Sequence, residues 1–271
     1  GLQGVGPRPE AIEKMGDKMT ARITMRAAGV PVIPGEENEH EDESDALAAI
    51  EEASHRVGYP MLLKASSGGG GKGMRAVHSP DQLIESAKGA RREAIAAFGD
   101  GRVYVERLLT GSKHVEIQVL ADRHGRTIHL GERECSVQRR HQKVFEEAPC
   151  ATMTPELREA MGQAAVAAAE AVDYEGAGTV EFLLAPTGEF FFLEMNTRIQ
   201  VEHPVTELVT GVDLVREQLR IAAGEAMSCG PLMIRGHAIE VRLYAEDASN
   251  NFLPAIASLA VFRPPEGPGV R

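Results

Sequence analysis

Apolar side chains recur every three or four residues in five stretches of the chain, which is the spacing of one face of a helix. In the first stretch Ile12 and Ile23 follow this spacing, Pro9 can open the helix, and Gly29 can close it. Ser44 is the predicted N-terminal cap of the second helix. The predicted helices cover residues 9–28, 44–57, 79–98, 154–172 and 212–223.

Between the helices the apolar period changes to two, which is typical of strands. Residues 114–121 show it most clearly, because Val115, Ile117 and Val119 alternate with polar residues. The predicted strands cover residues 61–65, 74–77, 103–107, 114–121, 127–131, 178–185, 189–195 and 237–245. Strands and helices interleave, but several strands pair locally as hairpins, which predicts an α+β fold and not a doubly wound parallel sheet.

Composition narrows the class of protein. The chain has 271 residues, of which 43% are hydrophobic and 25% charged, as in soluble globular proteins. A formal net charge of −11 argues against general nucleic-acid binding. No apolar run approaches the roughly 18 residues that a membrane span needs. The cysteines Cys135, Cys150 and Cys229 form no CxxC pair, which argues against a disulfide framework or a zinc site. The carboxylate-rich residues 36–45 predict a solvated loop or a boundary between units.

Four consecutive glycines, residues 68–71, lie between two predicted strands. Glycine lets the backbone approach a ligand closely, and its N–H groups can face phosphate oxygens. Lys64, at the end of the preceding strand, can reach the same anion. A flexible surface loop is the alternative, but the flanking strands favour phosphate binding. The loop is not a Walker motif, since Gly73 follows Lys72, and no helix follows it as in a dinucleotide fold.

Oxygen ligands converge on the later predicted hairpin. Glu181 and Glu194 lie in its two strands, and Asn196 points to the same face as Glu194. Hard oxygen donors suit Mg²⁺ that is bound to the phosphates of a nucleotide. Either glutamate alone would more often be a solvated surface residue. The glycine loop in the same chain favours the metal site.

Two polar segments predict binding of a small anion. In residues 196–204, Arg198 offers a planar fork that suits bicarbonate, and Glu202 is a candidate general base. Residues 138–143 supply further cationic donors. A loop held by internal salt bridges and an exposed basic face are the respective alternatives. In an acidic protein a concentrated basic run favours an anion site.

With these residues the chain resembles the biotin carboxylase subunit or domain of biotin-dependent carboxylases, which belong to the ATP-grasp superfamily. The resemblance covers nearly the whole chain, and residues 194–206 are specific to this family among ATP-grasp enzymes. Residues 243–247 and 252–255 are more similar to acyl-CoA carboxylases of the methylcrotonyl-CoA type than to acetyl-CoA or pyruvate carboxylases. The matching segments are residues 15–18, 64–74, 114–119, 138–143, 176–179, 194–206 and 236–240.

The resemblance implies an ATP-grasp fold with a glycine-loop lid subdomain. The ATP-grasp domain would cover residues 1–230, with the lid at about residues 33–107. Residues 231–271 would be the beginning of the biotin carboxylase C-terminal domain, and the family's N-terminal domain would be absent. We therefore expect weak or no turnover from this stretch alone, because parts of the adenine pocket, the biotin site and the dimer interface would be missing.

The resemblance also implies a role for individual residues. Arg242 matches the arginine that stabilises enolised biotin, and the catalytic residues implied are Glu202, Arg198, Lys143 and Arg242. The implied bicarbonate site is Lys143, Arg198, Gln200, Val201 and Glu202. The implied metal ligands are Glu181, Glu194 and Asn196. The residues implied to bind ATP are Lys18, Lys64, Gly69, Gly70, Gly71, Met74, Glu106, Arg107, Leu109, His114, Gln138 and His141.

The implied reaction is the carboxylation of biotin with ATP and bicarbonate through carboxyphosphate, the first half-reaction of an acyl-CoA carboxylase. Its cofactors would be ATP, Mg²⁺ or Mn²⁺, and biotin held covalently on a carrier. The partners would be a carboxyltransferase, a biotin carboxyl carrier domain and, for a full-length protein, further copies of itself. Neither nucleic acid nor membrane is expected. The compartment would be the cytoplasm in a bacterium or the mitochondrial matrix in a eukaryote.

Three departures from the family pattern are Ser67 in place of a glycine, Phe145 in place of a smaller aliphatic residue, and residues 150–152 in place of a Pro/Gly-containing stretch. Two other functions stay open. An ATP-grasp ligase that joins an activated carboxylate to an amine would use the same glycine loop and metal site, but not Arg198, Glu202 or Arg242. A nucleotide-binding module without catalysis is disfavoured, because every candidate catalytic residue is present.

Overall fold

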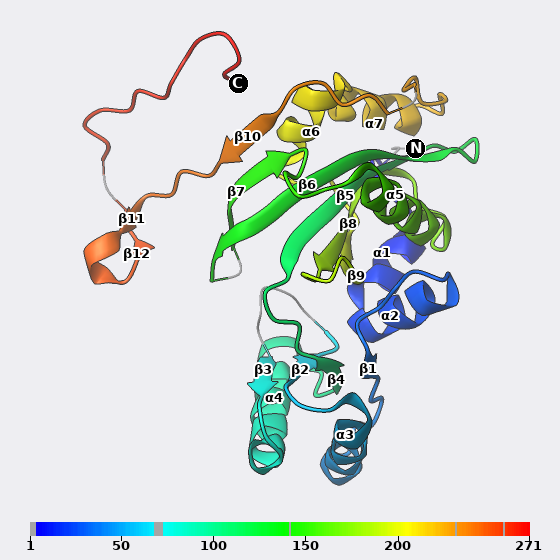
Figure 1. Ribbon diagram of the computed structural model, residues 1–271, viewed down its shortest axis with the longest axis vertical. Coiled ribbons are helices and arrows are strands. Elements are labelled where there is room, and N and C mark those ends of the chain that lie inside the picture. The colour runs from blue at the N-terminus through cyan, green and yellow to red at the C-terminus, as the bar shows by residue number, and fades with distance from the viewer. Residues whose placement is uncertain (1–3, 68–72, 141, 231, 257) are drawn as a thin grey trace.

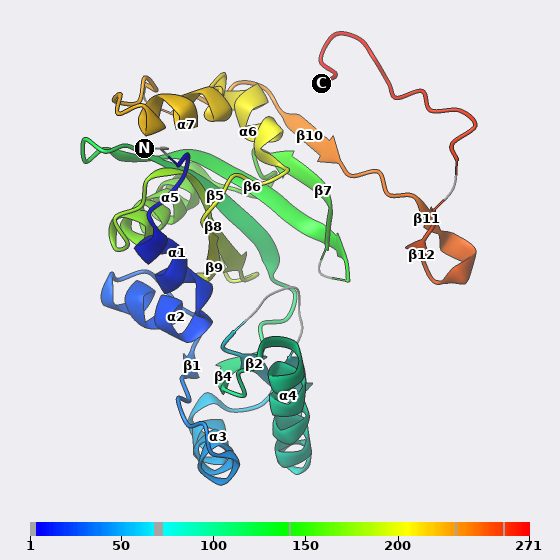
Figure 2. The same ribbon diagram turned by 180° about the vertical axis from the view of Figure 1, so that it is seen from behind.

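The computed structural model describes residues 4–67, 73–140, 142–230, 232–256 and 258–271. Figure 1 shows a larger unit around a six-stranded sheet and a smaller unit around a four-stranded sheet. A C-terminal arm extends away from the larger unit, as the view from behind in Figure 2 also shows. Helices are interleaved with antiparallel strand pairs, which confirms the predicted α+β class.

The sheet of the larger unit has the strand order β10-β7-β6-β5-β8-β9, with every described pair antiparallel. Its strands are β5 (Lys113–Ala121), β6 (Thr127–Arg139), β7 (Gln142–Ala148), β8 (Gly176–Leu184), β9 (Phe190–Asn196) and β10 (Ala238–Val241). The helices packed around it are α1 (Pro9–Gly16), α2 (Lys18–Ala27), α5 (Pro155–Glu170), α6 (His203–Thr210) and α7 (Leu214–Ala222).

The smaller unit lies between α2 and β5 in the chain. Its sheet has the order β1-β4-β2-β3, and α3 and α4 pack against it. The bounds of these elements are β1 (Gly35–Glu36), α3 (Glu43–Val57), β2 (Met61–Ala65), β3 (Met74–Val77), a 3₁₀ turn (Pro80–Gln82), α4 (Leu83–Phe98) and β4 (Val103–Arg107). The arm carries the short pair β11 (Glu246–Asp247) and β12 (Leu253–Pro254), with a 3₁₀ turn (Ala248–Asn250) between them.

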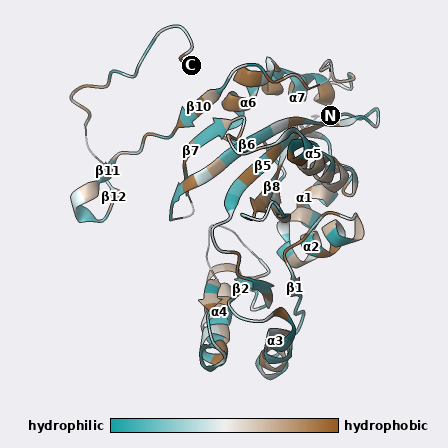
Figure 3. Cartoon of the chain, viewed as in Figure 1, coloured by the Kyte–Doolittle hydropathy of each residue, from teal (hydrophilic) through white to brown (hydrophobic). Residues whose placement is uncertain are grey.

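Strand β5 has two buried faces of opposite chemistry. Val115, Ile117 and Val119 belong to the main apolar cluster, together with residues of α5. Glu116 and Gln118, which alternate with them, are fully buried on the other face. Hydrophilic and hydrophobic stretches therefore share the strands of this sheet (Figure 3). The larger sheet thus buries polar groups beneath one of its faces, where the candidate site is built.

The first predicted helix is two helices. Asp17 adopts an extended conformation between α1 and α2, and its side chain accepts a hydrogen bond from the Thr20 amide as the cap of α2. Its other oxygen accepts a hydrogen bond from the Ser66 hydroxyl, and Lys18 N–H donates to the Ser66 carbonyl. The break lets the start of α2 pair with the chain next to the glycine loop. Sequence periodicity cannot predict such a long-range contact.

Several other predictions were wrong in detail. Ile12 and Ile23, which follow the predicted apolar spacing, are about half exposed. Asp42 and not Ser44 caps α3. Residues 36–45 are not wholly solvated, since Arg22 and Arg26 both bind Glu37.

Strand β7 and helix α6 are among the elements that were not predicted. In the predicted basic segment, residues 138–139 end β6 and residues 142–143 begin β7. The polar stretch that begins with Glu202 continues into α6. Both were missed because their polar residues face a buried site, which hides the usual alternation of apolar and polar positions.

Gly35 tests the contact between β1 and β4. A Cβ atom added at residue 35 would lie 2.3 Å from the Val105 carbonyl oxygen and 2.9 Å from the Glu106 Cα, and backbone atoms cannot yield as a flexible side chain does. We expect Gly35→Ala to lower the free energy of unfolding by about 1–3 kcal/mol, measured by urea denaturation.

Gly16→Ala is the matched control, since nothing lies within 4 Å of its added Cβ and its φ is unstrained. It should cost no stability. Equal unfolding free energies for the two variants would contradict the predicted clash.

Candidate active site

A cavity of about 610 Å³ opens where the two units face each other. Strands β2, β3 and β4 of the smaller unit and β5, β6, β7, β8 and β9 of the larger sheet contribute lining residues. The segment between β9 and α6 and the residues just after β10 complete the wall. The cavity therefore depends on both units.

Every described residue of the predicted site lines this cavity. These residues are Lys18, Lys64, Met74, Glu106, Arg107, Leu109, His114, Gln138, Lys143, Glu181, Glu194, Asn196, Arg198, Gln200, Val201, Glu202 and Arg242. Gly69, Gly70, Gly71 and His141 lie outside the described residues. The structure thus brings Lys18 and Arg242 to the same cavity, although they are more than 200 positions apart in the sequence.

Arg133 of β6 lies beneath the cavity and has no exposed surface. Its guanidinium donates to the Glu116 carboxylate over 2.5 Å and is held by four further side-chain oxygens. Those oxygens belong to Gln118, Thr206, Thr179 and Gln200. A buried arginine is tolerated only when its donors are satisfied in this way. Arg133 and Glu116 were missed at the level of sequence, although the polar positions of residues 114–121 were the signal.

The ammonium of Lys143 joins three strands of the cavity wall. It donates to Glu116, to Glu181 over 2.9 Å and to Glu202 over 2.6 Å. Burial lowers the pKa of Lys143, but the surrounding carboxylates outweigh burial and raise it well above its ordinary value. Lys143 is therefore a fixed cation at the centre of the site.

Glu202 lies between two cations. Lys143 binds one of its oxygens, and Arg242 donates to the other over 2.8 Å. Burial raises the pKa of Glu202, but Lys143 and Arg133 outweigh burial and lower it below its ordinary value. The carboxylate is therefore ionised and able to accept a proton at neutral pH. Arg242 also donates through Nε to the buried Glu146, which anchors the arginine on β7.

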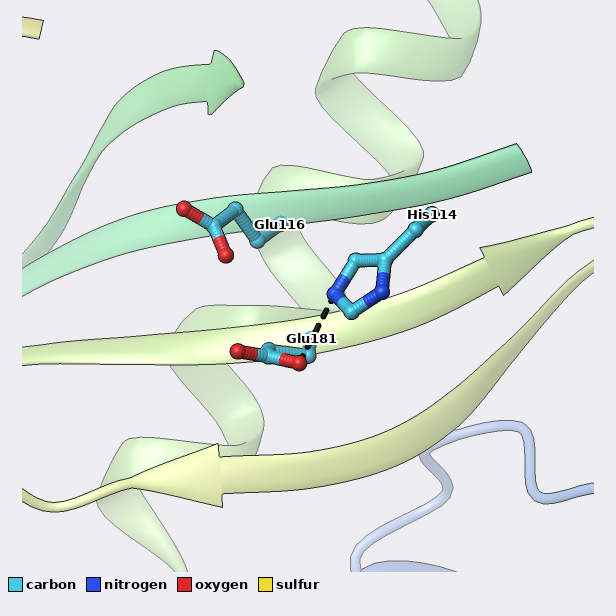
Figure 4. Close-up of side chains that lie close together, drawn as sticks. All are labelled: His114, Glu116 and Glu181. Atoms are coloured by element: carbon cyan, nitrogen blue, oxygen red, sulfur yellow. Dashed lines mark ion pairs between the residues drawn. The ribbon is translucent and has the colours of Figure 1, made fainter. Parts of the chain in front are cut away.

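His114 and Glu181 face each other across β5 and β8, as Figure 4 shows. His114 Nε2 lies 2.7 Å from a Glu181 oxygen, and Gln138 contacts the other ring nitrogen at 2.9 Å. Burial lowers the pKa of His114, but Glu181 outweighs burial and raises it. His114, Glu116 and Glu181 are spaced closely enough to hold a metal ion, and so are Glu116, Cys135 and Glu202. In both groups the Lys143 ammonium already binds two of the carboxylates.

The predicted metal ligands differ from these two groups in including Glu194, although Lys143 also binds Glu181. Glu194 is directly opposite Glu181 in the register of β8 and β9. Among the described residues, none donates a hydrogen bond to the Glu194 carboxylate, so its oxygens are available. Asn196 donates to Glu181 through its side-chain nitrogen, and its side-chain oxygen accepts a hydrogen bond from Arg198. Two carboxylates and one amide oxygen are suitable donors for Mg²⁺.

Lys18, the first residue of α2, and Lys64 of β2 both line the cavity. Burial is the larger cause that lowers the pKa of Lys18, and the nearby Lys64 lowers it further. Both lysines can therefore bind an anion in the cavity. Glu106 is almost fully buried, and its two oxygens are bound by Arg22 and by Lys64. Only the backbone of Glu106 is left to contact a bound nucleotide.

The outer part of the cavity is more open and partly apolar. Arg198 is exposed and bonds to the carbonyl oxygens of Ile199 and Asn196, so its guanidinium is accessible to an anion. Apolar side chains that were not predicted from the sequence also line the cavity and suit a flat ring. They include Ile33, Leu62, Leu183 and Leu193.

These features define a nucleotide-binding domain of the ATP-grasp class, and comparison with known proteins agrees. Residues 17–229 match the family model of the carbamoyl-phosphate synthase L chain, ATP binding domain. The chain belongs to this family.

Relatives with named functions are similar over nearly the whole chain. Biotin carboxylase of Nostoc sp. is 54% identical over 98% of this chain and 59% of its own length. Biotin carboxylase 2 of Bacillus subtilis is 51% identical over 98% of this chain and 60% of its own length. A pyruvate carboxylase subunit of Methanothermobacter thermautotrophicus is 53% identical over 100% of this chain and 55% of its own length. The chain therefore spans little more than half the length of the curated relatives that it matches.

Solved structures show the same fold. A Campylobacter jejuni biotin carboxylase in complex with a β,γ-ATP compound has a TM-score of 0.92 at 42% identity, covering 98% of this chain and 59% of that one. The biotin carboxylase domain of Hydrogenobacter thermophilus 2-oxoglutarate carboxylase, in complex with MgADP, ADP and bicarbonate, has a TM-score of 0.91 at 45% identity, covering 98% and 58%. The fold is the ATP-grasp fold, without a closed barrel. Across the described residues, no helix has the length and apolarity to cross a membrane.

Replacement of Arg133 tests the buried charges beneath the cavity. Arg133→Met keeps much of the volume but leaves Glu116 with Lys143 as its one remaining cationic partner, in a fully buried position. We expect the free energy of unfolding to fall by about 3–5 kcal/mol, measured by urea denaturation.

Arg123→Met is the control, because Arg123 forms a single, partly exposed ion pair with Glu175. It should cost less than about 1 kcal/mol. A loss for Arg133→Met no larger than that of the control would show that Arg133 does not stabilise the buried carboxylate.

Glu240 of β10 predicts a pH dependence of stability. Burial, together with Glu146 and Glu202, raises the pKa of Glu240 from 4.5 to about 7. Between these values the folded protein keeps a proton that the unfolded chain has released, so stability falls as the pH rises from about 4.5 to 7. We expect Glu240→Gln to reduce this fall in thermal unfolding curves from pH 5 to 8 and to raise the melting temperature at pH 8. Glu266→Gln, on the exposed tail, is the control and should follow the wild-type curve. If Glu240→Gln also followed the wild-type curve, the raised pKa of Glu240 would be refuted.

Proposed function

We propose that this chain is the ATP-binding catalytic part of a biotin carboxylase, which carboxylates carrier-bound biotin with ATP and bicarbonate. One observation carries the proposal. Glu202 is held between Lys143 and Arg242 at the side of a cavity that also exposes Arg198, the predicted bicarbonate ligand. A base flanked by cations suits an anionic substrate that must lose a proton, and the names of the relatives support the same reaction.

Bicarbonate would bind between Arg198 and Lys143, with Gln200 and Val201 beside it. Glu202 would accept its proton, and the bicarbonate oxygen would attack the γ-phosphorus of ATP while the bond to ADP breaks. The product is carboxyphosphate. Lys18 and Lys64 would offset the charge that develops on the phosphoryl oxygens. Mg²⁺, when held by Glu181, Glu194 and Asn196, would supply further positive charge there.

The second step would use Arg242. Carboxyphosphate would break at its carbon–oxygen bond into CO₂ and phosphate, and the phosphate would remove the ureido proton of biotin. The biotin nitrogen would then attack CO₂. Arg242, fixed by Glu146 and close to Glu202, would stabilise the negative charge on the ureido oxygen of biotin. Exclusion of water by the closed cavity would protect carboxyphosphate from hydrolysis.

We also propose the division of the chain that the resemblance implies. Residues 1–230 would form the ATP-grasp domain, with residues 33–107 as its lid, and residues 231–271 would begin the next domain. Support comes from the smaller unit, whose own apolar cluster lies within residues 50–105. The adenine ring would lie on the apolar residues of the outer cavity, near Met74 and Leu109.

The partners in this proposal are a biotin carboxyl carrier and a carboxyltransferase. Relatives named for pyruvate and for 2-oxoglutarate have similar identity to this chain, so the final acceptor would be chosen by the carboxyltransferase. The methylcrotonyl-CoA type stays a prediction from residues 243–247 and 252–255.

ADP release tests the reaction. It would be measured with and without bicarbonate and free biotin, on this chain and on the chain completed with the flanking domains of the Nostoc relative. We expect both substrates to stimulate release by the completed protein. Glu202→Gln should lower the stimulated rate at least about a hundredfold, because it removes the base while keeping the shape of the side chain.

Glu147→Gln is the matched control, since Glu147 lies in β7, as Lys143 does, and pairs with His237 outside the cavity. It should keep the wild-type response. Hydrolysis of ATP that ignores both bicarbonate and biotin would refute biotin carboxylation and leave a nucleotide-binding function.

A further inference from the structure

Arg22 lies in α2, on the larger unit, and is 2% exposed. It neither lines the cavity nor belongs to the predicted site. A buried guanidinium needs a partner for each of its donors. Its partners therefore show what it holds in place.

Each guanidinium nitrogen of Arg22 binds the chain where it passes between the two units. One donates to the Ile33 carbonyl over 2.9 Å, and Nε donates to Glu37 over 3.1 Å, at the point where the chain enters the smaller unit. The third donates to Glu106, two residues before the chain leaves at Leu108. Figure 1 shows the first of these connections, from α2 to β1, next to α2. One side chain thus joins the entry and the exit of the smaller unit to the larger one.

The hydrogen bonds of Glu106 connect Arg22 to Lys64. The second oxygen of Glu106 accepts a hydrogen bond from Lys64 Nζ over 3.0 Å. The Tyr104 ring is 5.4 Å from the Arg22 guanidinium and 5.7 Å from the Lys64 ammonium, so it contacts both cations. Burial lowers the pKa of Lys64, but Glu106 outweighs burial and raises it well above its ordinary value. Lys64 is therefore kept charged at the cavity wall through Glu106.

We propose that Arg22 is a positioning residue for nucleotide binding, which acts through Glu106 to fix Lys64 and the smaller unit against the larger one. The inference rests on the proposed function only in taking ATP as the ligand of Lys64. Without Arg22, Glu106 would have Lys64 as its one cationic partner and the two chain connections would lose their shared anchor. Lys64 would then be drawn toward Glu106 and away from a phosphate.

Equilibrium binding of a fluorescent ATP analogue tests the proposal in the whole chain. Arg22→Met should weaken binding by about tenfold or more, as expected for residues of one charged network. Arg22→Lys, which can reach Glu106 but cannot also bind Ile33 and Glu37, should fall between wild type and Arg22→Met. It also provides a folded variant if the loss of the charge prevents folding.

Arg26→Met is the matched control. Arg26 lies one turn further along α2 and also binds Glu37, but it is about half exposed and does not contact Glu106. Its replacement should leave the affinity for the analogue unchanged. Thermal unfolding of each variant would show that the binding data refer to folded protein.

A double-mutant cycle separates positioning from general stability. If Arg22 acts through Lys64, Arg22→Met should weaken binding little or not at all once Lys64→Met is present. Additive losses, or wild-type affinity in folded Arg22→Met or Arg22→Lys, would overturn the proposal. A wild-type chain that binds no ATP analogue would instead overturn the proposed function itself, and with it this role of Arg22.

Discussion

The ion pair between Arg133 and Glu116 is the constraint on which the candidate site depends. Both side chains are wholly buried beneath the cavity, where an unpaired charge would cost several kcal/mol. Glu116 can therefore be present only because Arg133 binds it, and its second oxygen then holds the Lys143 ammonium. Lys143 in turn fixes Glu181 and Glu202. The orientation of Glu202, the proposed base, thus follows from a contact that is buried beneath the cavity.

The same arrangement occurs twice in the molecule. In the larger unit Arg133 binds Glu116, which binds Lys143; in the smaller unit Arg22 binds Glu106, which binds Lys64. In each case the buried arginine offers several donors in a fixed plane, which orients the carboxylate, and the carboxylate keeps a lysine charged at the cavity wall. A lysine alone would be flexible and, when buried, would tend to lose its proton. These two sets of contacts supply stable positive charge to the cavity, as the proposed binding of anions requires.

Much of this organisation was predictable from residue pattern. The strands at residues 61–65, 74–77 and 103–107 were predicted with the bounds that the structure shows, because their apolar alternation and flanking turns are clear. The hairpin carboxylates and Glu202, which were predicted because their residue types suit metal binding and proton transfer, do line the cavity, and their roles stay predictions. Strand β7 and helix α6 were missed, since their polar residues face buried partners and break the expected period. The split of the first helix at Asp17 depends on Ser66, which is distant in sequence.

The sequence by itself determined the fold class and many of the polar residues that line the cavity, because local periodicity and a specific family resemblance both lie in the order of the amino acids. Only the tertiary structure decided how these residues work together. Arg133, Glu116, Glu146 and Arg22 have no local motif, and their importance arises from burial and from charge partners on other strands or helices. Burial and pairing are properties of the folded chain, since the energy of a charge depends on what surrounds it in space and not on its neighbours in sequence.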